Sequence, residues 1–327
     1  MTDSTDSELP LITIGMCTFN AQETINRALK SALDQTWPNI EIVIVDDCSS
    51  DRTWSILKNM MDVHSEIKIY QNNANGGVAI SRNRIITEAK GEFIAFFDDD
   101  DESYSDRLSL QYERVVSYEN DFNLDGAPVI CHSSRKVVYP DGRILNQPTM
   151  GTILNRYVPH GVSVVRRILL GDKLEDGRGA CPTCCQFARN STYQMLKGFD
   201  PDFRRSEDTE FVIRLAFSGG HFVGLSDPLV VQYMGRNSPK SLEQEYYYHK
   251  MVLKKFSDFL KSEGQYAFCR KWLDLKYCWL LKSYRSFFVK GVIIFYKHPG
   301  YTLKRLIQAI PNIGINNQFR QFHSRDL

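Results

Sequence analysis

The sequence predicts an α/β protein with a mostly parallel central sheet, and three observations lead to this prediction. Short apolar runs alternate with segments of helical spacing over residues 11–118, a pattern typical of βαβ units. One run, residues 93–97, is apolar at every position, as in a strand buried on both faces of a parallel sheet. Polar residues follow each predicted strand at once, and parallel strands place such ends along one edge of the sheet.

The first predicted strand covers residues 11–17, and the helix after it covers 21–35. Ile25, Ala28, Leu29 and Leu33 share one face of that helix, as expected for a period of 3.6 residues. The next elements follow in order: a strand at 40–45, a helix at 52–61, a strand at 67–70, a helix at 78–90, a strand at 93–97 and a helix at 106–118.

Beyond residue 118 the regular alternation ends. We expect two strands, at 129–132 and 136–139, and helices from about 191 and over 206–218. Gly219-Gly220 ends the second of these helices. From about residue 241 the chain is expected to be helical to its end.

Charge divides the chain into two parts. Residues 250–327 hold 15 Lys/Arg and 4 Asp/Glu, a net of +11, and residues 1–249 hold 25 and 35, a net of −10. The basic C-terminal part is therefore expected to meet an anionic partner. No nucleic-acid recognition motif accompanies it, so nucleic acid is not the partner we expect.

Targeting segments and a disulfide framework are not predicted. Residues 1–8 are polar and acidic, unlike a signal peptide, and the sequence has no run of about 18 apolar residues that would predict a transmembrane helix. Eight Cys residues at irregular spacings fit reduced thiols in the cytoplasm. Cys181-x-x-Cys184 lacks a second ligand pair for zinc, so buried thiols are the favoured interpretation.

Four consecutive carboxylates, Asp98 to Asp101, follow the apolar strand at 93–97. Like charges this close repel each other, so a fold that keeps them together needs a compensating partner. Mg²⁺ or Mn²⁺ is one such partner, because these ions prefer oxygen ligands and share them with substrate phosphates. A solvated acidic turn is the alternative, since runs of charge are usually exposed.

Two nucleotide-binding classes are disfavoured. The turn after the first strand reads Cys17-Thr18-Phe19-Asn20-Ala21, without the glycines that a dinucleotide-binding dehydrogenase needs. No Gly-x-x-x-x-Gly-Lys loop of a P-loop NTPase is present either. Phosphates would have to be met by a metal ion at the acidic run and by cations such as Arg82.

Residues 11–110 resemble the nucleotide-binding half of the family 2 glycosyltransferases, which have the GT-A fold. Short motifs carry the resemblance in the order of that family: Thr18-Phe19-Asn20, Gln35-Thr36-Trp37, Asp46-Asp47-Cys48-Ser49-Ser50, Asn75-Gly76-Gly77 with Ser81-Arg82-Asn83, and Gly91-Glu92-Phe93-Ile94 leading to Asp98-x-Asp100-Asp101. Gly198-Phe199-Asp200 and Glu207-Asp208-Thr209-Glu210 are similar to later motifs of the family.

The resemblance implies a division of the chain. A GT-A domain would cover residues 9–240, with a nucleotide-binding half at 9–118 and an acceptor-binding half at 119–240. A basic, aromatic helical region would cover 241–327.

The resemblance also implies roles for the motif residues toward a UDP-sugar. Phe19 would stack on or line the uracil, and the main chain around Cys17 and Thr18 would hold its edge. Asn20 of the same motif would also belong to the donor-binding site. Asp47 would accept from the uracil N3–H, and Asp46 would support its loop. Arg82 would face the diphosphate or the uridine. Each residue has a plainer alternative: a core aromatic for Phe19, helix capping for the acidic pair, and a solvated helical side chain for Arg82.

Within the acidic run, the resemblance makes Asp100 the direct ligand of Mn²⁺ or Mg²⁺. Asp98 would meet the ribose, or the metal through water, and Asp99 the ribose or sugar. Asp101 is expected to cap a helix instead, and with four successive Asp residues the assignment stays open by one position.

Asp208 is the candidate general base, because an inverting transfer needs a carboxylate opposite the leaving diphosphate. Glu207 would position the acceptor or share the proton. The alternative is an acidic first helical turn, which needs no catalysis. For His160 and His221 a structural or surface role is favoured over sugar contacts.

The implied function is an inverting, metal-dependent hexosyl- or N-acetylhexosaminyl-transferase of bacterial surface-glycan synthesis. Its acceptor would be a glycan or lipid-linked glycan. The enzyme is expected in the cytoplasm, with the basic region 250–327 either on the inner face of the plasma membrane or in a packing or homo-oligomer interface. A non-catalytic GT-A-like binding protein is the first alternative, and a sugar nucleotidyltransferase, which lacks its glycine-rich signature here, is the second.

Overall fold

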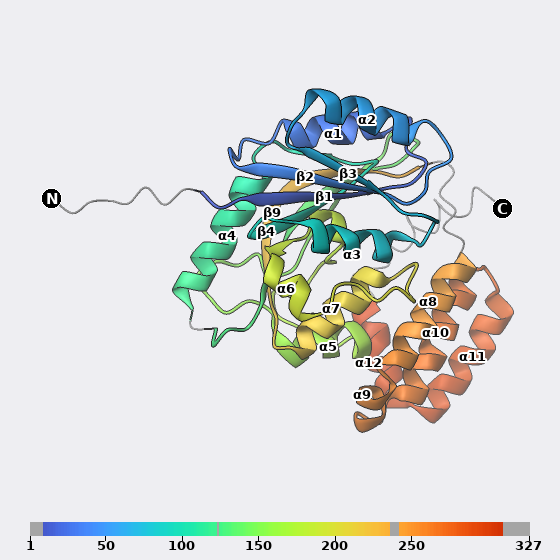
Figure 1. Ribbon diagram of the computed structural model, residues 1–327. Helices are drawn as coiled ribbons and strands as arrows, with labels where there is room; N and C mark the ends of the chain where they lie inside the picture. Colours follow the sequence, from blue (N-terminus) through green and yellow to red (C-terminus); the bar gives the residue numbers. More distant parts are fainter. Residues whose placement is uncertain (1–8, 123, 236–241, 310–327) are drawn as a thin grey trace. The chain divides into compact units, whose positions relative to one another are not determined.

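The computed structural model describes residues 9–122, 124–235 and 242–309, and these form two compact units (Figure 1). The first unit comprises the described residues of 1–164 and 174–238. The second comprises those of 165–173 and 239–327. Helix α5 (Gly161–Leu170) runs from the first unit into the second. The second unit thus takes one of its segments from the middle of the chain.

A single sheet, with strand order β3-β2-β1-β4-β8-β6-β9-β5 and β7 paired to β6, forms the first unit. β1 pairs in parallel with β2 and β4, β2 with β3, and β6 with β9. Only the short strands β5, β7 and β8 pair antiparallel with their neighbours. The strands are β1 (Ile12–Thr18), β2 (Ile40–Asp46), β3 (Ile67–Gln71), β4 (Phe93–Asp98), β5 (Glu102–Ser103), β6 (Val129–Val138), β7 (Ile144–Gln147), β8 (Phe187–Arg189) and β9 (His221–Tyr233).

Helices cover both faces of the parallel part of the sheet (Figure 1). Alternate residues of β1 show this, because Ile14 and Met16 belong to the same buried cluster as Leu29 of α1. Gly15 between them faces α3, where a Cβ atom would lie 2.6 Å from Cγ2 of Ile85. The helices of this unit besides α5 are α1 (Ile25–Leu33), α2 (Thr53–Val63), α3 (Val78–Glu88), α4 (Arg107–Asp121), α6 (Asn190–Met195) and α7 (Glu207–Phe217), with a 3₁₀ turn η1 (Thr183–Cys185).

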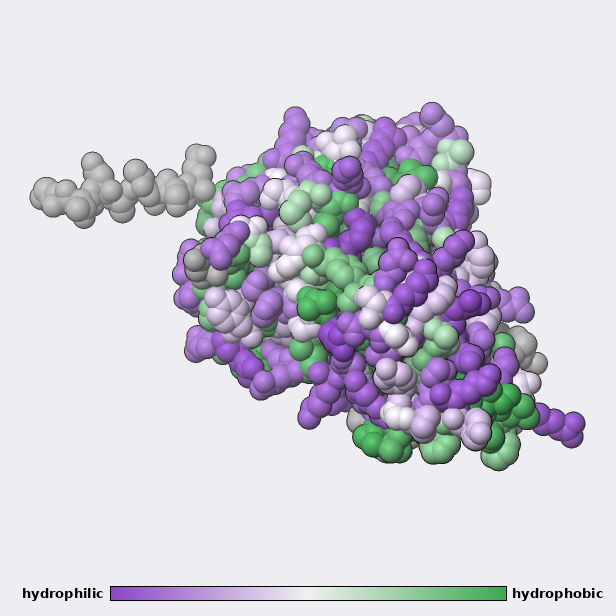
Figure 2. Space-filling model, turned by 90° about the horizontal axis from the view of Figure 1, so that it is seen from below, coloured by the Kyte–Doolittle hydropathy of each residue, from purple (hydrophilic) through white to green (hydrophobic). Residues whose placement is uncertain are grey.

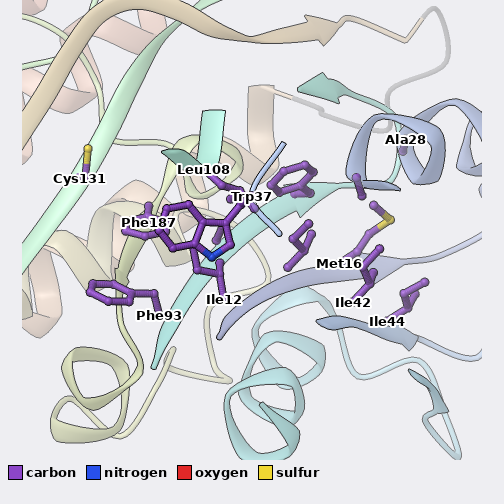
Figure 3. Packing of buried hydrophobic residues seen from close by; sticks show 14 of the residues in the cluster. Ile12, Met16, Ala28, Trp37, Ile42, Ile44, Phe93, Leu108, Cys131 and Phe187 are labelled. Atoms are coloured by element: carbon purple, nitrogen blue, oxygen red, sulfur yellow. The ribbon is translucent and has the colours of Figure 1, made fainter. Parts of the chain in front are cut away.

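The main core lies between the sheet and helices α1, α2 and α4. Figure 3 shows part of this cluster, in which Trp37 and Leu108 lie near Phe187. Phe187 stacks on Phe93 with ring centroids 5.1 Å apart. Since β8 is antiparallel to β4, this contact joins the parallel half of the sheet to the remainder.

One expectation for the region beyond residue 118 needs correction, and two elements were missed. The two strands predicted at 129–132 and 136–139 are one strand, β6, because Ser133 and Ser134 stay in the ladder through a register shift opposite β9. The sequence analysis also did not predict β9 or α5. Polar residues and Pro228 interrupt the alternation within β9, which hides it from a pattern search.

The second unit is helical over its described residues. Its helices are α8 (Leu242–Lys255), α9 (Ser257–Ser262), α10 (Tyr266–Leu280), α11 (Tyr284–Lys297) and α12 (Pro299–Ala309). Arg305 of α12 donates to the backbone oxygen of Leu169 at 2.8 Å, and Lys304 pairs with Asp172 at 2.7 Å. These contacts hold the segment 165–173 within the unit. Helix was also expected for residues 310–327, which lie outside the described residues.

Among the described residues, no helix has both the length and the apolar character to cross a membrane.

Ile44 and Ile144 offer a matched test of the core. Ile44 lies in β2 and is fully buried, whereas Ile144 in β7 is 63% exposed. We expect Ile44→Ala to lower the free energy of unfolding by about 2–5 kcal/mol, because it removes buried methylene groups and leaves a cavity. Ile144→Ala should change it by about 0.5 kcal/mol. Urea unfolding followed by circular dichroism measures both, and equal effects would contradict the assigned core.

Candidate functional site

The ends of β1, β2 and β4 meet at one edge of the sheet. Thr18 at the end of β1 is in register with Asp46 of β2, and Cys17 with Asp98 of β4. Polar segments that are far apart in the sequence therefore converge at this edge, as the carboxyl ends of parallel strands do in ligand-binding α/β sheets.

The loop after β1 presents an aromatic ring. Phe19 is 47% exposed, and its backbone N–H donates to Oδ2 of Asp99 at 3.1 Å. Asn20 has φ +52°, a left-handed conformation that Asn adopts more readily than most residues. Its Oδ1 accepts from the N–H of Ser50 at 2.9 Å. Phe19 is thus held at the surface and is not a core aromatic.

Asp47 organises the loop that precedes α3. The residue is buried, and its Oδ1 accepts from the side chain of Asn72 at 2.8 Å and from the N–H of Gly76 at 3.0 Å. Its Oδ2 accepts from the N–H of Gly77 at 2.8 Å. Three of the roughly four lone-pair positions of the carboxylate are used in this way.

Asp46, at the end of β2, is fully buried and holds the neighbouring backbone in place. Its Oδ2 accepts from the N–H of Ser49 at 3.0 Å and from Gln71 at 2.9 Å. Neither aspartate forms a side-chain cap of α2, whose N-cap residue is Arg52.

The four carboxylates after β4 have four different environments. Asp98 and Asp99 are half-buried and Asp100 is exposed. Asp101 is buried, and its Oδ1 accepts from the N–H of Tyr233 at 3.0 Å. Asp101 therefore ties the acidic run to the end of β9 and does not cap a helix.

Crowding of these carboxylates perturbs their titration. Burial, followed by the charge of Asp100, raises the pKa of Asp99 to about 7. Burial and the charges of Asp98 and Asp100 also raise the pKa of Asp101. A bound cation would relieve this repulsion, so the electrostatics fit a site for a positive ion.

The donor atoms near the run also fit a divalent cation. One atom each from Asp98, Asp101 and Cys184 lie within 4.8 Å of one another. Oδ2 of Asp101 is buried without a hydrogen-bond partner among the described residues. Sequence reasoning named Asp98 and Asp100 for the metal, whereas this group contains Asp98 and Asp101. Their carboxylate oxygens are the donors that Mg²⁺ and Mn²⁺ prefer. Cys184 suits these ions poorly, because its donor is sulfur and because the hydrogen bond to Cys185 and burial raise the pKa of its thiol.

Arg82 of α3 joins the acidic run to the start of α7. Its guanidinium donates to Oε1 of Glu207 at 2.6 Å and lies 3.6 Å from Oδ1 of Asp98. The side chain is buried and lies over the ring of Phe199, 5.3 Å from its centroid. Burial alone would lower the pKa of Arg82, but the charges of Glu207 and Asp98 outweigh it and raise the pKa.

The first turn of α7 presents Glu207 and Asp208. Ser206 before them has φ +59°, and both carboxylates lie where the helix dipole favours negative charge. Burial raises the pKa of Glu207 although Arg82 opposes the shift. Asp208 is half-buried, and its Oδ1 accepts from the N–H of Thr209 at 2.6 Å.

Arg204 is a cation near this edge that sequence reasoning missed. It donates to Oδ1 of Asn75 at 3.2 Å and lies against Gly77. The loop pinned by Asp47 is therefore also held from the second half of the first unit. A single Arg in a polar segment gives no sequence signal for such a contact.

His160 and His221 stack with ring centroids 4.7 Å apart. Burial and His160 lower the pKa of His221 to about 4, and its Nδ1 lies 2.8 Å from the hydroxyl of Tyr118. His221 begins β9, whereas Tyr233 at the other end of that strand contacts Asp101. The histidine pair is thus far from the acidic run, and its contacts support the structural interpretation.

Residues 13–169 match the model of the family described as glycosyl transferase family 2. This stretch belongs to glycosyl transferase family 2. The family 2 segment includes Asp47, Arg82 and the acidic run, while Glu207 and Asp208 lie beyond it. The resemblance predicted from the motifs is confirmed.

Two curated bacterial relatives resemble the family 2 segment. The putative teichuronic acid biosynthesis glycosyltransferase TuaG of Bacillus subtilis is 32% identical over 142 residues, which cover 40% of this chain and 56% of that protein. WfaP of Escherichia coli, a UDP-Glc:alpha-D-GlcNAc-diphosphoundecaprenol beta-1,3-glucosyltransferase, is 41% identical over 118 residues, 34% of this chain and 46% of that protein. The chain thus spans about half the length of the curated relatives that it matches.

A solved structure extends the likeness beyond the family 2 segment. The mannosyltransferase PcManGT of Pyrobaculum calidifontis, in complex with GDP-Man and Mn²⁺, gives a TM-score of 0.55 at 15% identity, covering 93% of this chain and 85% of that chain. At this identity the likeness concerns the fold alone. It confirms the predicted GT-A fold with its mostly parallel sheet and flanking helices.

Replacement of Arg82 tests the bridge between β4 and α7. Arg82→Met should lower the free energy of unfolding by about 3–5 kcal/mol, because it leaves the carboxylate of Glu207 buried without its partner. Glu207→Gln added to Arg82→Met should recover part of this loss, giving a non-additive double-mutant cycle. Urea unfolding measures the cycle.

Lys30 of α1 is the control. Its side chain is 75% exposed and forms an ion pair with Asp34, four residues later on the same helix, so Lys30→Met should cost about 1 kcal/mol or less. Additive effects of the two substitutions at Arg82 and Glu207 would contradict the bridge.

Proposed function

We propose that the chain is an inverting, metal-dependent glycosyltransferase. It would move a hexosyl or N-acetylhexosaminyl group from a nucleoside diphosphate sugar, here a UDP-sugar, to a hydroxyl of a glycan or lipid-linked glycan in cell-surface polysaccharide synthesis. The observation that carries the proposal is that Arg82 joins the acidic run to the Glu207–Asp208 turn, at the sheet edge where β2 ends before the Asp47 loop. The names of TuaG and WfaP support the reaction class, and the name of WfaP supports the lipid-linked acceptor.

The nucleoside would bind along the loop after β1. The exposed ring of Phe19 offers a surface for uracil, and the main chain of Thr18 and Asn20 lies beside it. Three lone pairs of Asp47 hold its loop, which leaves about one for the uracil N3–H. Asp98 and Asp99 would contact the ribose or the sugar.

Mn²⁺ or Mg²⁺ would be held by Asp100, with Asp98 beside it. Asp100 is exposed and so can share an ion with substrate oxygens, whereas Asp101 is buried against β9. The ion, when bound, would neutralise charge that develops on the leaving diphosphate. Arg82 would add positive charge to the same edge, and its main role would be to hold Asp98 and Glu207 in position.

Asp208 would act as the general base. The acceptor hydroxyl attacks C1 of the sugar, the bond from C1 to the diphosphate oxygen breaks, and the hydroxyl proton passes to Asp208. Oδ1 of Asp208 accepts from Thr209, so we assign the proton to Oδ2. Glu207 is paired with Arg82 and would position this turn rather than take the proton.

A lipid-linked acceptor would place the enzyme in the cytoplasm, at the inner face of the plasma membrane. WfaP carries diphosphoundecaprenol in its name, and the basic C-terminal region fits an anionic surface.

Isothermal titration of UDP with and without Mn²⁺ tests the donor site. We expect Mn²⁺ to tighten UDP binding about tenfold or more, a difference of about 1.4 kcal/mol. Asp100→Ala should abolish this effect, whereas the surface control Asp62→Ala should retain it. The assignment of Asp100 fails if Mn²⁺ leaves the UDP affinity unchanged or if Asp100→Ala behaves like the wild type. The same titration with GDP tests the choice of nucleotide.

Single-turnover transfer tests the base, once a screen of nucleotide sugars has identified a donor. Asp208→Asn should lower the rate about 10²–10⁴-fold, because the amide cannot accept the proton, while UDP binding stays unchanged. Asp202→Asn, an exposed residue in the preceding turn, is the matched control and should keep the wild-type rate. Retained turnover in Asp208→Asn would remove it as the base.

A further inference from the structure

Helices α11 and α12 of the second unit expose an extensive apolar surface, here named the α11–α12 face. Tyr296 is 88% exposed and Phe288 is 72% exposed. The face comprises the apolar and aromatic residues Tyr284, Phe288, Val289, Val292, Ile293, Phe295, Tyr296, Leu303, Leu306 and Ile307. Isolated exposed apolar residues are common, but exposed apolar residues that recur along the same helix face mark an interaction surface. Green patches of hydrophobic residues reach the molecular surface in Figure 2.

Spacing along α11 separates two apolar stripes. Ile294 is buried, and Phe287, Gly291 and His298 are half-buried around it, which marks the stripe that packs inward within the second unit. Phe288 starts a second stripe, with Val292, Phe295 and Tyr296 at the following i+4, i+7 and i+8 positions, and all four residues are exposed. Packing against the rest of the second unit explains the inward apolar stripe of α11. It does not explain the second, exposed stripe, which therefore indicates a separate binding partner.

α12 repeats this arrangement. Thr302 is buried and Arg305 donates to the backbone of Leu169, so this side faces inward. Leu303, Leu306 and Ile307 recur at i, i+3 and i+4, and all three are exposed. Both helices therefore present apolar residues that the described part of the second unit does not cover.

The charges around the face have one sign. Residues 281–309 contain six Lys/Arg and no Asp/Glu. Lys282, Arg285, Lys290 and Lys297 are exposed, and none of these four forms an ion pair with another described residue. Lys304, by contrast, pairs with Asp172. The face thus combines an apolar surface with unneutralised positive charge.

We propose that the α11–α12 face rests on an anionic phospholipid surface. Apolar side chains would enter the boundary between headgroups and acyl chains, and the lysines and arginine would lie at the phosphate level. Tyr284 and Tyr296 suit this boundary, because each ring has an apolar body and a polar tip. The inference deepens the membrane location of the proposed function and rests on it, but lipid binding itself requires neither donor nor acceptor.

A second copy of the chain fits the face less well. In a two-fold dimer the same patch meets itself, so the basic residues of both copies would approach each other without an intervening carboxylate. Like charges placed together in an interface oppose association. An anionic lipid surface supplies the opposite charge across the whole face.

Flotation of the full chain with vesicles tests the proposal. We use vesicles of phosphatidylcholine alone and of equal parts phosphatidylcholine and phosphatidylglycerol. The chain should float with the anionic vesicles and not with the neutral ones. Arg285→Glu combined with Lys290→Glu should weaken anionic-vesicle binding at least about tenfold, since each basic residue near such a surface contributes about fivefold. Phe288→Ser combined with Val292→Ser and Phe295→Ser should abolish flotation.

Matched controls use exposed residues of the first unit. Val63→Ser combined with Ile144→Ser removes side chains that are 72% and 63% exposed, and Lys58→Glu reverses an exposed charge. These variants should float like the wild type.

Three results would overturn the proposal: no flotation of the wild type with anionic vesicles, equal flotation of the wild type and the triple serine variant, or a dimer in light scattering that the triple serine variant disrupts. UDP titration of the same variants separates the two proposals. Unchanged UDP binding with lost flotation supports the lipid face, whereas flotation without UDP binding would contradict the proposed function alone.

Discussion

The buried pairing of Arg82 with Glu207 is the interaction on which the candidate site depends. A guanidinium inside a protein needs opposite charge and hydrogen-bond acceptors close by, or its desolvation is not offset. Here Glu207 and Asp98 supply the charge, and they come from α7 and β4. One side chain of α3 thereby fixes the distance between the carboxylates that would face the donor and the turn that would face the acceptor.

Much of the nucleotide-binding half could be predicted from the sequence, because its strands are buried on both faces. Such strands are continuous apolar runs, and their polar ends are visible at once, as at Asp46-Asp47 and Asp98. Since parallel strands align their ends, the convergence of these residues follows from topology alone. The exposure of the Phe19 ring and the hydrogen bonds by which Asp47 holds its loop could not be predicted from the sequence.

Contacts between distant segments account for what was missed. Arg82 and Glu207 are 125 positions apart, and Asp101 meets Tyr233 at a separation of 132, so no local spacing reveals either pair. β9 was hidden because Ser226, Asp227 and Pro228 interrupt its pattern. Cys184 reaches the acidic run only through the turn η1. These contacts depend on how β6, β8 and β9 join the parallel strands, and the spacing of residues within one segment does not reveal that arrangement.

The composition of the second unit has a consequence for the synthesis of the chain. Leu169 and Leu170 at the end of α5 are buried in the finished unit, but Arg305, which binds the backbone of Leu169, lies 136 residues later. At about 5–20 residues per second on the ribosome, that segment would wait roughly 7–27 s for its partner. The apolar end of α5 therefore leaves the ribosome well before Arg305 can contact it. Cys269 of α10, which donates to the same backbone oxygen of Leu169, lies 100 residues later, so the segment gains its contacts in steps as the chain is made.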